Sequence, residues 1–272
     1  MLEFSVLMPV YIKENPEFLK LAIQSLLEQT VLPSEIVIVE DGPLTDELHN
    51  IINDYVNGYP GMFNIIRLPE NHGMGYAMDT GLKQCKYDYV ARMDSDDIAI
   101  KDRFKIQTTF LRDHPEIDLV GGYIEEFSIV PGDLNRFRKV PVSQPEILTF
   151  AKYRNPVNHM TVMLRKQKAL KAGSYWHKRV LEDYHLWYKM LISGCKFHNI
   201  PEILVHARVG NNMVGRRKGM KYIKEELDFF RTMVEDKFIT KKEYYTHSAA
   251  RIVLKLLPTS LLNFAYTKLL RR

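Results

Sequence analysis

The sequence predicts an α/β fold in which a mostly parallel sheet is covered by helices on both faces. Short, near-continuous apolar runs alternate with segments of helical periodicity through the first part of the chain. Apolar runs of this kind are typical of strands that are buried on both faces of a parallel sheet. Some of these runs end in carboxylates, and ligands of such sheets bind beyond the carboxyl ends of the strands. We therefore expect a ligand site at that edge of the sheet.

The first part of the chain alternates regularly between strand and helix patterns. Asn15 is suited to cap the first helix, and Pro16 suits its first position because that position needs no backbone N–H. Apolar residues then recur with helical spacing. The expected strands are 4–10, 35–40, 63–68 and 87–93, and the expected helices are 16–27, 45–55 and 73–85.

The pattern becomes mixed after residue 103. Residues 118–129 resemble a strand pair or a bend through the Gly121-Gly122 pair, and 162–164 form a short strand. Residues 207–219 are rich in glycine, asparagine and arginine, which indicates a loop. The expected helices are 180–192, 225–237 and 249–270.

The composition is that of a soluble globular protein, with 46% hydrophobic and 26% charged residues. Cys85 and Cys195 are too few for a disulfide framework, so we expect both to be small core residues in a reducing compartment. The chain opens directly into a strand-like run, so no signal peptide is expected before the fold. No run of about 18 uncharged apolar residues is present, so no bilayer-spanning segment is expected.

Positive charge is concentrated in the C-terminal part of the chain. Residues 201–272 hold 15 lysines and arginines against 7 acidic residues. The chain lacks the aromatic and basic interleaving of nucleic-acid modules, which leaves phosphate groups or an anionic membrane as partners. Apolar residues after Pro258 predict a helix that lies on an anionic membrane surface, or alternatively one that packs on the domain. These apolar residues are Leu261, Leu262, Ala265, Tyr266, Leu269 and Leu270.

An acidic cluster directly follows the apolar run 87–93. In Asp94-Ser95-Asp96-Asp97, the Asp-x-Asp spacing places two carboxylates on the same side of an extended chain. Carboxylate oxygens suit a hard divalent cation, which could in turn hold a diphosphate. The alternative is a polar turn without a ligand. We expect Asp94 and Asp96 to bind the cation, and Asp97 to act as a local cap or to support these two ligands.

A second carboxylate, Asp41, follows the strand-like run 35–40 and precedes Gly42. It could accept the imide N–H of uracil, or it could belong to a turn in which the glycine supplies unusual dihedral angles. We expect Tyr11, Asp41 and the Asp94/Asp96 pair to converge on one crevice, because carboxyl ends of parallel strands share an edge.

The segment 71–75 matches neither a dinucleotide-binding fingerprint nor a P-loop. We expect Gly73 and Gly75 to permit close packing where the next helix begins. Approach of the backbone to a nucleotide is the alternative for this segment.

Glu182 and Asp183 begin the helix expected at 180–192. At about 100° per residue, Asp183 lies at the centre of an apolar face and Glu182 at its edge. A carboxylate aimed at an apolar surface is costly unless it is paired or functional, so Asp183 is a candidate general base. The alternative is a helix cap that interacts with the macrodipole. The apolar face consists of Leu186, Trp187, Met190 and Leu191.

Two further segments could contact a substrate. His159 lies in a polar loop before a short strand, where a structural role is the alternative. The segment 208–218 contains Arg208 and Arg216 among mobile glycines. It is either a solvated basic loop or a lid whose guanidinium groups pair with a diphosphate.

Taken together, these motifs resemble an inverting family 2 glycosyltransferase with a GT-A fold, of the type that builds bacterial surface polysaccharides. The resemblance covers roughly residues 1–217. It departs from the family pattern at Glu40, where aspartate is commoner, and at residues 43–46, which leaves base specificity open. The motifs that carry it are residues 5–11, 25–30 and 35–42, Asn71-x-Gly73, residues 94–97 and 182–187.

The resemblance implies a role for each matching position. Asp183 would be the catalytic base, and Asp94 and Asp96 the ligands of Mn²⁺ or Mg²⁺. Apart from the resemblance, we expect His159 and Glu182 to contact the acceptor. Residues 1–103 would bind the nucleotide sugar and 104–220 the acceptor, followed by a helical extension at 221–272. The donor, expected to be a UDP-sugar, would contact Pro9, Val10, Tyr11, Asp41, Gly73, Asp94, Ser95, Arg208 and Arg216.

The implied activity is metal-dependent transfer of a sugar to a saccharide or lipid-linked acceptor, at the inner face of the cell membrane in the cytoplasm. One rival is a sugar nucleotidyltransferase, which would need a glycine-rich basic loop after the first strand, and residues 9–12 lack it. The other is a non-catalytic scaffold of a polysaccharide assembly complex, against which the intact Asp96 and Asp183 argue.

Overall fold

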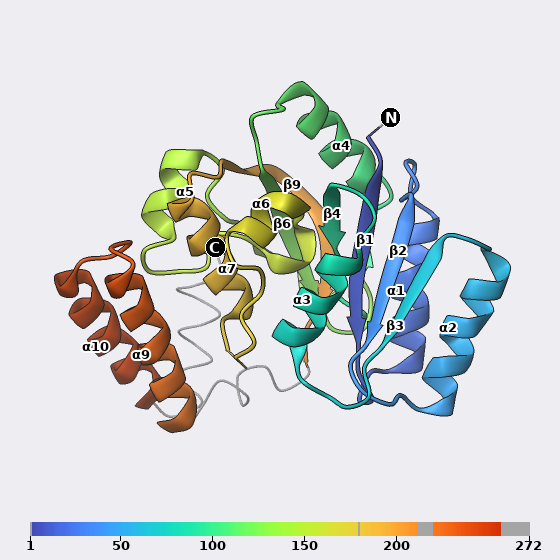
Figure 1. Ribbon diagram of the computed structural model, residues 1–272, viewed down its shortest axis with the longest axis horizontal. Coiled ribbons are helices and arrows are strands. Elements are labelled where there is room, and N and C mark those ends of the chain that lie inside the picture. Colours follow the sequence, from blue (N-terminus) through green and yellow to red (C-terminus); the bar gives the residue numbers. More distant parts are fainter. Residues whose placement is uncertain (1, 179, 211–219, 257–272) are drawn as a thin grey trace.

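A computed structural model describes residues 2–178, 180–210 and 220–256. Within them, a nine-stranded sheet has the order β3-β2-β1-β4-β8-β6-β9-β5, with β7 paired to β6 (Figure 1). The strands are β1 (Phe4–Val10), β2 (Glu35–Glu40), β3 (Phe63–Arg67), β4 (Tyr89–Arg92), β5 (Ile98–Ala99), β6 (Leu119–Phe127), β7 (Arg136–Arg138), β8 (Met163–Arg165) and β9 (Phe197–Arg208).

The helices lie on both faces of this sheet (Figure 1). They are α1 (Pro16–Leu27), α2 (Asp46–Gly58), α3 (Met74–Gln84), α4 (Arg103–Asp113), α5 (Gln144–Phe150), α6 (Lys166–Lys171), α7 (Glu182–Ile192), α9 (Met220–Glu235) and α10 (Lys241–Leu256), with a short 3₁₀ turn at His159–Thr161.

The apolar alternation along the strands places one core on each face of the sheet. In β1, Val6 and Met8 pack against α1, α2 and α4, whereas Leu7 faces α3 and α7. Neighbouring β2 behaves in the same way, with Ile38 on the first face and Val37 on the second. Because both faces are buried, these strands read as continuous apolar runs, which confirms the predicted α/β class.

Strand directions bring the carboxyl ends of several strands to one edge. Strands β1, β2 and β4 are mutually parallel, and β8 is antiparallel to both β4 and β6. Strand β6 therefore runs in the same direction as β4, and β9 is parallel to β6. We call this side, at the bottom of Figure 1, the carboxyl edge; residues 10, 40, 92, 127 and 208 end their strands there.

Several predicted elements are confirmed at their predicted bounds. Strands β1 and β2 span 4–10 and 35–40, and the Asn15 side chain accepts hydrogen bonds from the N–H groups of Glu17 and Phe18. Of the two alternatives for 118–129, the strand pair is wrong and the bend fits, because β6 is one strand with register shifts directly after Gly122. The loop expected from residue 207 begins later, because β9 continues to Arg208. The helix expected from 249 begins at 241, and its portion after 256 lies outside the described residues.

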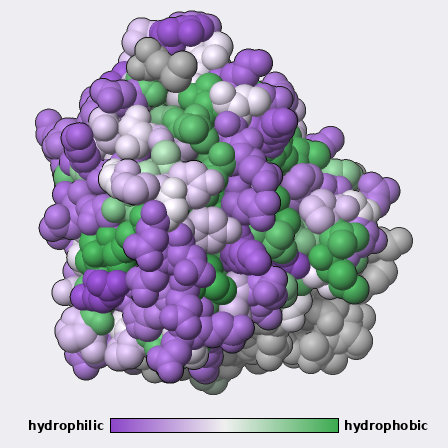
Figure 2. All heavy atoms as spheres, turned by 90° about the vertical axis from the view of Figure 1, so that its right-hand side faces the viewer, coloured by the Kyte–Doolittle hydropathy of each residue, from purple (hydrophilic) through white to green (hydrophobic). Residues whose placement is uncertain are grey.

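Helix α9 packs against α7, and α10 packs against α9. An aromatic cluster joins Tyr184 and Tyr188 of α7 to Phe229, Phe230 and Met233 of α9. The Tyr188 hydroxyl donates to the Asp236 carboxylate at 2.9 Å. Within the described residues, none of these helices is long and apolar enough to cross a bilayer. The face shown in Figure 2 is mainly hydrophilic, with apolar residues in scattered patches.

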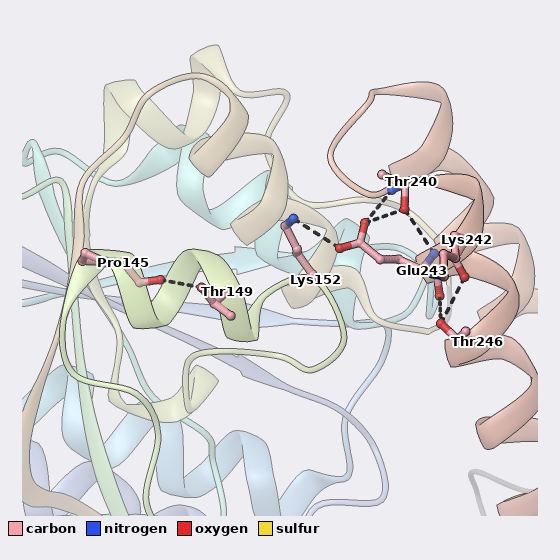
Figure 3. A network of polar contacts seen from close by, with 7 residues as sticks. All are labelled: Pro145, Thr149, Lys152, Thr240, Lys242, Glu243 and Thr246. Carbon is pink, nitrogen blue, oxygen red and sulfur yellow. Dashed lines mark hydrogen bonds and ion pairs between the residues drawn. The ribbon is translucent and has the colours of Figure 1, made fainter.

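The start of α10 is fixed by a capping box (Figure 3). The Thr240 N–H donates to the Glu243 carboxylate at 2.7 Å, and the Glu243 N–H donates to the Thr240 hydroxyl at 3.2 Å. The same carboxylate pairs with Lys152 at 3.3 Å, which ties α10 to the segment after α5. The cap therefore fixes both the start of the helix and its contact with the domain.

We expect Thr240→Ala to lower the free energy of unfolding by about 1 kcal/mol, because it removes the side-chain half of this cap. Thr246→Ala is the matched control, since the bonds of the Thr246 hydroxyl within the described residues go to carbonyls of its own helix. Urea denaturation of both variants measures the difference. Equal midpoints for the two variants would contradict the assignment of the cap.

Candidate active site

The acidic cluster lies at the carboxyl edge, directly after β4. Asp94, Asp96 and Asp97 each offer a carboxylate oxygen, and these oxygens lie within 4.8 Å of one another. Burial, with smaller contributions from the carboxylates of Asp94 and Glu14, raises the pKa of Asp96 to about 7. Burial also raises the pKa of Asp97 well above its usual range. Three carboxylates this close together and partly buried are stable in their charged form only if positive charge lies near them.

These residues fit a divalent cation. Carboxylate oxygens are the ligands that Mg²⁺ and related hard cations prefer. The Oδ2 atom of Asp97 is buried and has no hydrogen-bond partner, although its Oδ1 accepts the Arg208 N–H at 2.7 Å. Asp97 is therefore buried beside the two expected ligands, which fits the supporting role better than a local cap.

Arg92, at the end of β4, holds the first carboxylate of the cluster. Its guanidinium forms an ion pair with Asp94, and its side chain is 4% exposed. The Nε and Nη1 groups of Arg92 are buried without partners. Sequence analysis missed this residue because an arginine inside the run 87–93 gave no sign that its side chain would turn toward the cluster.

Glu14 is a further acidic residue at this edge that sequence analysis missed. The Ser95 hydroxyl donates to its carboxylate, which joins the loop after β1 to the acidic cluster. Burial raises the pKa of Glu14, although the hydrogen bond from Ser95 opposes the shift. We expected Ser95 to contact the donor, and in the structure its hydroxyl donates its hydrogen bond to Glu14.

Arg208 ends β9 beside the cluster. Its guanidinium lies over the rings of Phe18 and Phe127, at 3.8 Å and 4.4 Å from the centroids. Its Nε donates to the backbone carbonyl of Asp96 at 3.1 Å. The structure therefore brings Arg208 to the acidic cluster, whereas Arg216 lies outside the described residues.

Asp41 is buried at the end of β2 and organises the loop before α3. Its carboxylate accepts the His72 N–H at 2.8 Å, the Gly73 N–H at 3.0 Å and the Asn71 amide at 3.0 Å. A carboxylate has about four lone-pair positions, so one is left for a ligand. These three hydrogen bonds hold the polar loop at residues 71–73 against the end of β2.

The two glycines of this loop differ in their roles. A Cβ on Gly75 would lie 2.0 Å from the Trp176 carbonyl oxygen, which confirms close packing at the helix start. The same expectation is wrong for Gly73, because no atom lies within 4 Å of where its Cβ would be. Its φ of +92° is instead what requires glycine.

Gly42 combines both constraints, and we expect Gly42→Ala to destabilise the fold by more than about 1 kcal/mol. Its φ is +86°, and a Cβ would lie 2.7 Å from the Asn71 backbone nitrogen, which must then move away from Asp41. Gly61→Ala is the matched control, with a φ of +82° but open space around the Cβ. Urea unfolding measures both, and a loss no larger in Gly42→Ala than in the control would contradict the role of the clash.

The end of β1 lies next to Asp41. Pro9 and Val10 are buried, and the Val10 carbonyl accepts the Asp41 N–H at 2.8 Å. Tyr11 is 38% exposed and follows directly at the same edge. Strand pairing thus places Tyr11, Asp41 and the acidic cluster at the same edge of the sheet.

Asp183 lies in the first turn of α7, where it is held by Asn155 from another segment and by its own neighbour Tyr184. Its Oδ2 accepts the Asn155 amide at 2.6 Å, and its Oδ1 accepts the Tyr184 N–H at 2.7 Å. The preceding Leu181 has a φ of +56°, a left-handed conformation that is unfavourable for a branched side chain. Asn155 was not among the predicted site residues, because nothing in the sequence links it to a helix 28 positions later.

Tyr175 interacts with charged groups of both α7 and β4. Burial raises its pKa well above the usual range, the charge of Arg92 lowers it, and the charges of Asp183 and Glu182 raise it. Its hydroxyl is 3.1 Å from Nε2 of His159. Burial lowers the pKa of His159 well below its usual range, and Arg92 adds to the shift. His159 is therefore neutral near pH 7, in an aromatic group that also includes Trp187.

Comparison with known proteins gives a consistent result. The profile described as "Glycosyl transferase family 2" matches residues 5–173. The amylovoran biosynthesis glycosyltransferase AmsE of Erwinia amylovora is 38% identical, over 97% of this chain and 98% of its own. An Escherichia coli protein named UDP-Gal:alpha-D-GlcNAc-diphosphoundecaprenol beta-1,3-galactosyltransferase is 37% identical, over 99% of this chain and 97% of its own.

Solved structures show the same fold at lower identity. S. aureus TarS 1–349 in complex with UDP-GlcNAc superposes with a TM-score of 0.69 at 20% identity, covering 98% of this chain and 76% of that one. The mannosyltransferase PcManGT of Pyrobaculum calidifontis, in complex with GDP-Man and Mn²⁺, gives a TM-score of 0.63 at 15% identity, covering 98% and 81%. These similarities identify the architecture as GT-A.

Proposed function

This chain belongs to glycosyltransferase family 2, and from that membership we propose that it transfers a sugar from a UDP-sugar to a lipid-linked saccharide, with inversion, in surface-polysaccharide biosynthesis. The observation that carries the proposal is the group of three carboxylates at the carboxyl edge, where their oxygens lie within 4.8 Å of one another. The relative that acts on a diphosphoundecaprenol-linked sugar supports the choice of donor and acceptor.

Asp94 and Asp96 would hold a divalent cation, Mn²⁺ or Mg²⁺, with Asp97 beside them. Such an ion supplies positive charge that stabilises the departing nucleoside diphosphate. Arg92 fixes the Asp94 carboxylate by its ion pair and, being buried, restricts it to one orientation. Arg208 adds a second positive charge beside the cluster, held by two aromatic rings.

The nucleoside would bind at the ends of β1 and β2, with the backbone at Pro9 and Val10, the ring of Tyr11, and Asp41. The free lone pair of Asp41 could accept the imide N–H of uracil, which favours a uridine nucleotide. Gly73 would allow the loop backbone to approach the donor. On the acceptor side, His159 and Glu182 would contact the sugar that receives the bond.

Asp183 would take the proton from the attacking hydroxyl of the acceptor. The Asn155 amide and the Tyr184 N–H orient its two oxygens, and each oxygen keeps a lone pair for that proton. The deprotonated oxygen of the acceptor then attacks the anomeric carbon from the face opposite the diphosphate. The bond to the leaving nucleoside diphosphate breaks as the new glycosidic bond forms. The configuration of the sugar is inverted without a covalent intermediate.

Thermal shift against a panel of nucleotide sugars, with and without Mn²⁺, tests the donor. A ligand at ~100 times its dissociation constant stabilises the folded state by about 2.7 kcal/mol, which gives a measurable shift. We expect UDP-sugars to stabilise the protein in the presence of Mn²⁺, and GDP-sugars to do so less. Stabilisation by no nucleotide sugar would contradict the proposal.

A further inference from the structure

The loop 128–135, which we call the apolar tip, projects exposed apolar side chains from the carboxyl edge. Ile129, Val130 and Leu134 are 79%, 57% and 39% exposed. The loop joins β6 to β7 and begins directly after Phe127, one of the rings that hold Arg208. The tip therefore lies at the same edge as the acidic cluster.

Hydrogen bonds hold the apolar tip in shape, although it is exposed. The Asp133 carboxylate accepts the N–H groups of Ser128 at 3.0 Å, Ile129 at 2.7 Å and Val130 at 3.3 Å. These bonds, that of Ile129 above all, lower the pKa of Asp133. A turn fixed in this way presents its apolar side chains outward instead of folding them inward.

A second exposed segment lies at the same edge, in the loop after β1. Tyr11 is 38% and Ile12 is 50% exposed, and the exposed Lys13 follows them. Glu14 ties this loop to Ser95 of the acidic cluster. Aromatic, aliphatic and cationic side chains around one edge are typical of protein surfaces that meet a lipid interface.

From this arrangement we propose that the apolar tip inserts into the lipid surface that carries the acceptor, with Ile129 and Val130 as its main contacts. The inference rests on the proposed function, because a lipid-linked acceptor places the site at a membrane surface. Size favours lipid over a second copy of the chain, since a stable protein interface buries about 800 Å² on each partner, far more than a few side chains of one loop. Shallow insertion needs only a few apolar side chains.

Cosedimentation of the full chain with vesicles of phosphatidylglycerol and phosphatidylethanolamine tests the proposal. We expect Ile129→Ser combined with Val130→Ser to lower the partition coefficient by about tenfold or more, because two apolar side chains no longer enter the lipid. Leu32→Ser is the matched control: Leu32 is 50% exposed and lies before β2, at the opposite edge of the sheet. The control should bind vesicles like the unmodified protein.

Transfer assays separate this inference from the proposed function. The double variant should transfer sugar to a soluble, short-chain acceptor at the normal rate, but more slowly to an acceptor embedded in vesicles. Vesicle binding of the double variant equal to that of the control would overturn the role of the tip. A double variant that loses self-association in gel filtration but binds vesicles normally would overturn it too, because the tip would then contact a second copy of the chain. If the unmodified protein transfers sugar to no acceptor, the proposed function is contradicted. The role of the tip is still tested in that case, because cosedimentation with vesicles requires no donor.

Discussion

Replacing Asp183 with asparagine should lower the rate of sugar transfer by about 10²–10⁴-fold and leave donor binding unchanged, because only general-base catalysis is removed. The amide cannot accept the acceptor's proton, but it has almost the same shape as the carboxylate. The loss should therefore fall on kcat measured with saturating acceptor. Donor affinity, measured by calorimetry in Mn²⁺, should match that of the unmodified protein.

Glu182→Gln is the matched control for this variant, since it removes a neighbouring carboxylate from the same helical turn. It should affect the KM for the acceptor more than kcat. If Asp183→Asn transfers sugar at a near-normal rate while Glu182→Gln does not, the base is Glu182. If neither variant loses activity, the base lies elsewhere and the assignment of α7 is wrong.

Asp96→Asn should weaken metal-dependent donor binding by at least about 100-fold, the upper end of the loss seen when only an outer-shell partner of a metal is removed. The substitution takes one negative charge from the three carboxylates that face one another at the carboxyl edge. The fold should survive, because the crowding of like charges is relieved. Titration of UDP-sugar with and without Mn²⁺ measures the effect.

Asp113→Asn is the control for the change in net charge, because Asp113 is 55% exposed at the end of α4. It should bind donor like the unmodified protein. Nucleotide affinity in Mn²⁺ that stays the same in Asp96→Asn would show that the acidic cluster is not the cation site.

The N-terminal half of the fold could be predicted from sequence because its signals are local. Apolar runs and caps such as Asn15 specify β1, α1 and β2 without help from distant residues. Strand direction then places Tyr11, Asp41 and Asp94 at one edge. Strand β9 was not predicted, because Pro201 and Glu202 interrupt its apolar pattern. It forms because it pairs with β6, which is distant in the sequence.

The supporting residues of the site could not be predicted, because each acts through a contact between distant segments. Asn155 meets Asp183, and Glu14 meets Ser95 across 81 positions. Arg92 occupies a strand position where an apolar residue would be ordinary, and only the fold turns its charge toward Asp94. Gly73 was misread for a similar reason, since a sequence does not distinguish a glycine needed for its φ from one needed for space.

The stereochemistry of the product tests the central claim most directly. The protein would be incubated with Mn²⁺, a UDP-α-sugar and lipid-linked monosaccharide acceptors, and the new linkage would be determined by NMR. A β-linked disaccharide, formed only when Mn²⁺ or Mg²⁺ is present and absent with Asp183→Asn, is the expected result. An α-linked product, or release of UDP without a disaccharide from every donor tried, would contradict inverting transfer by this site.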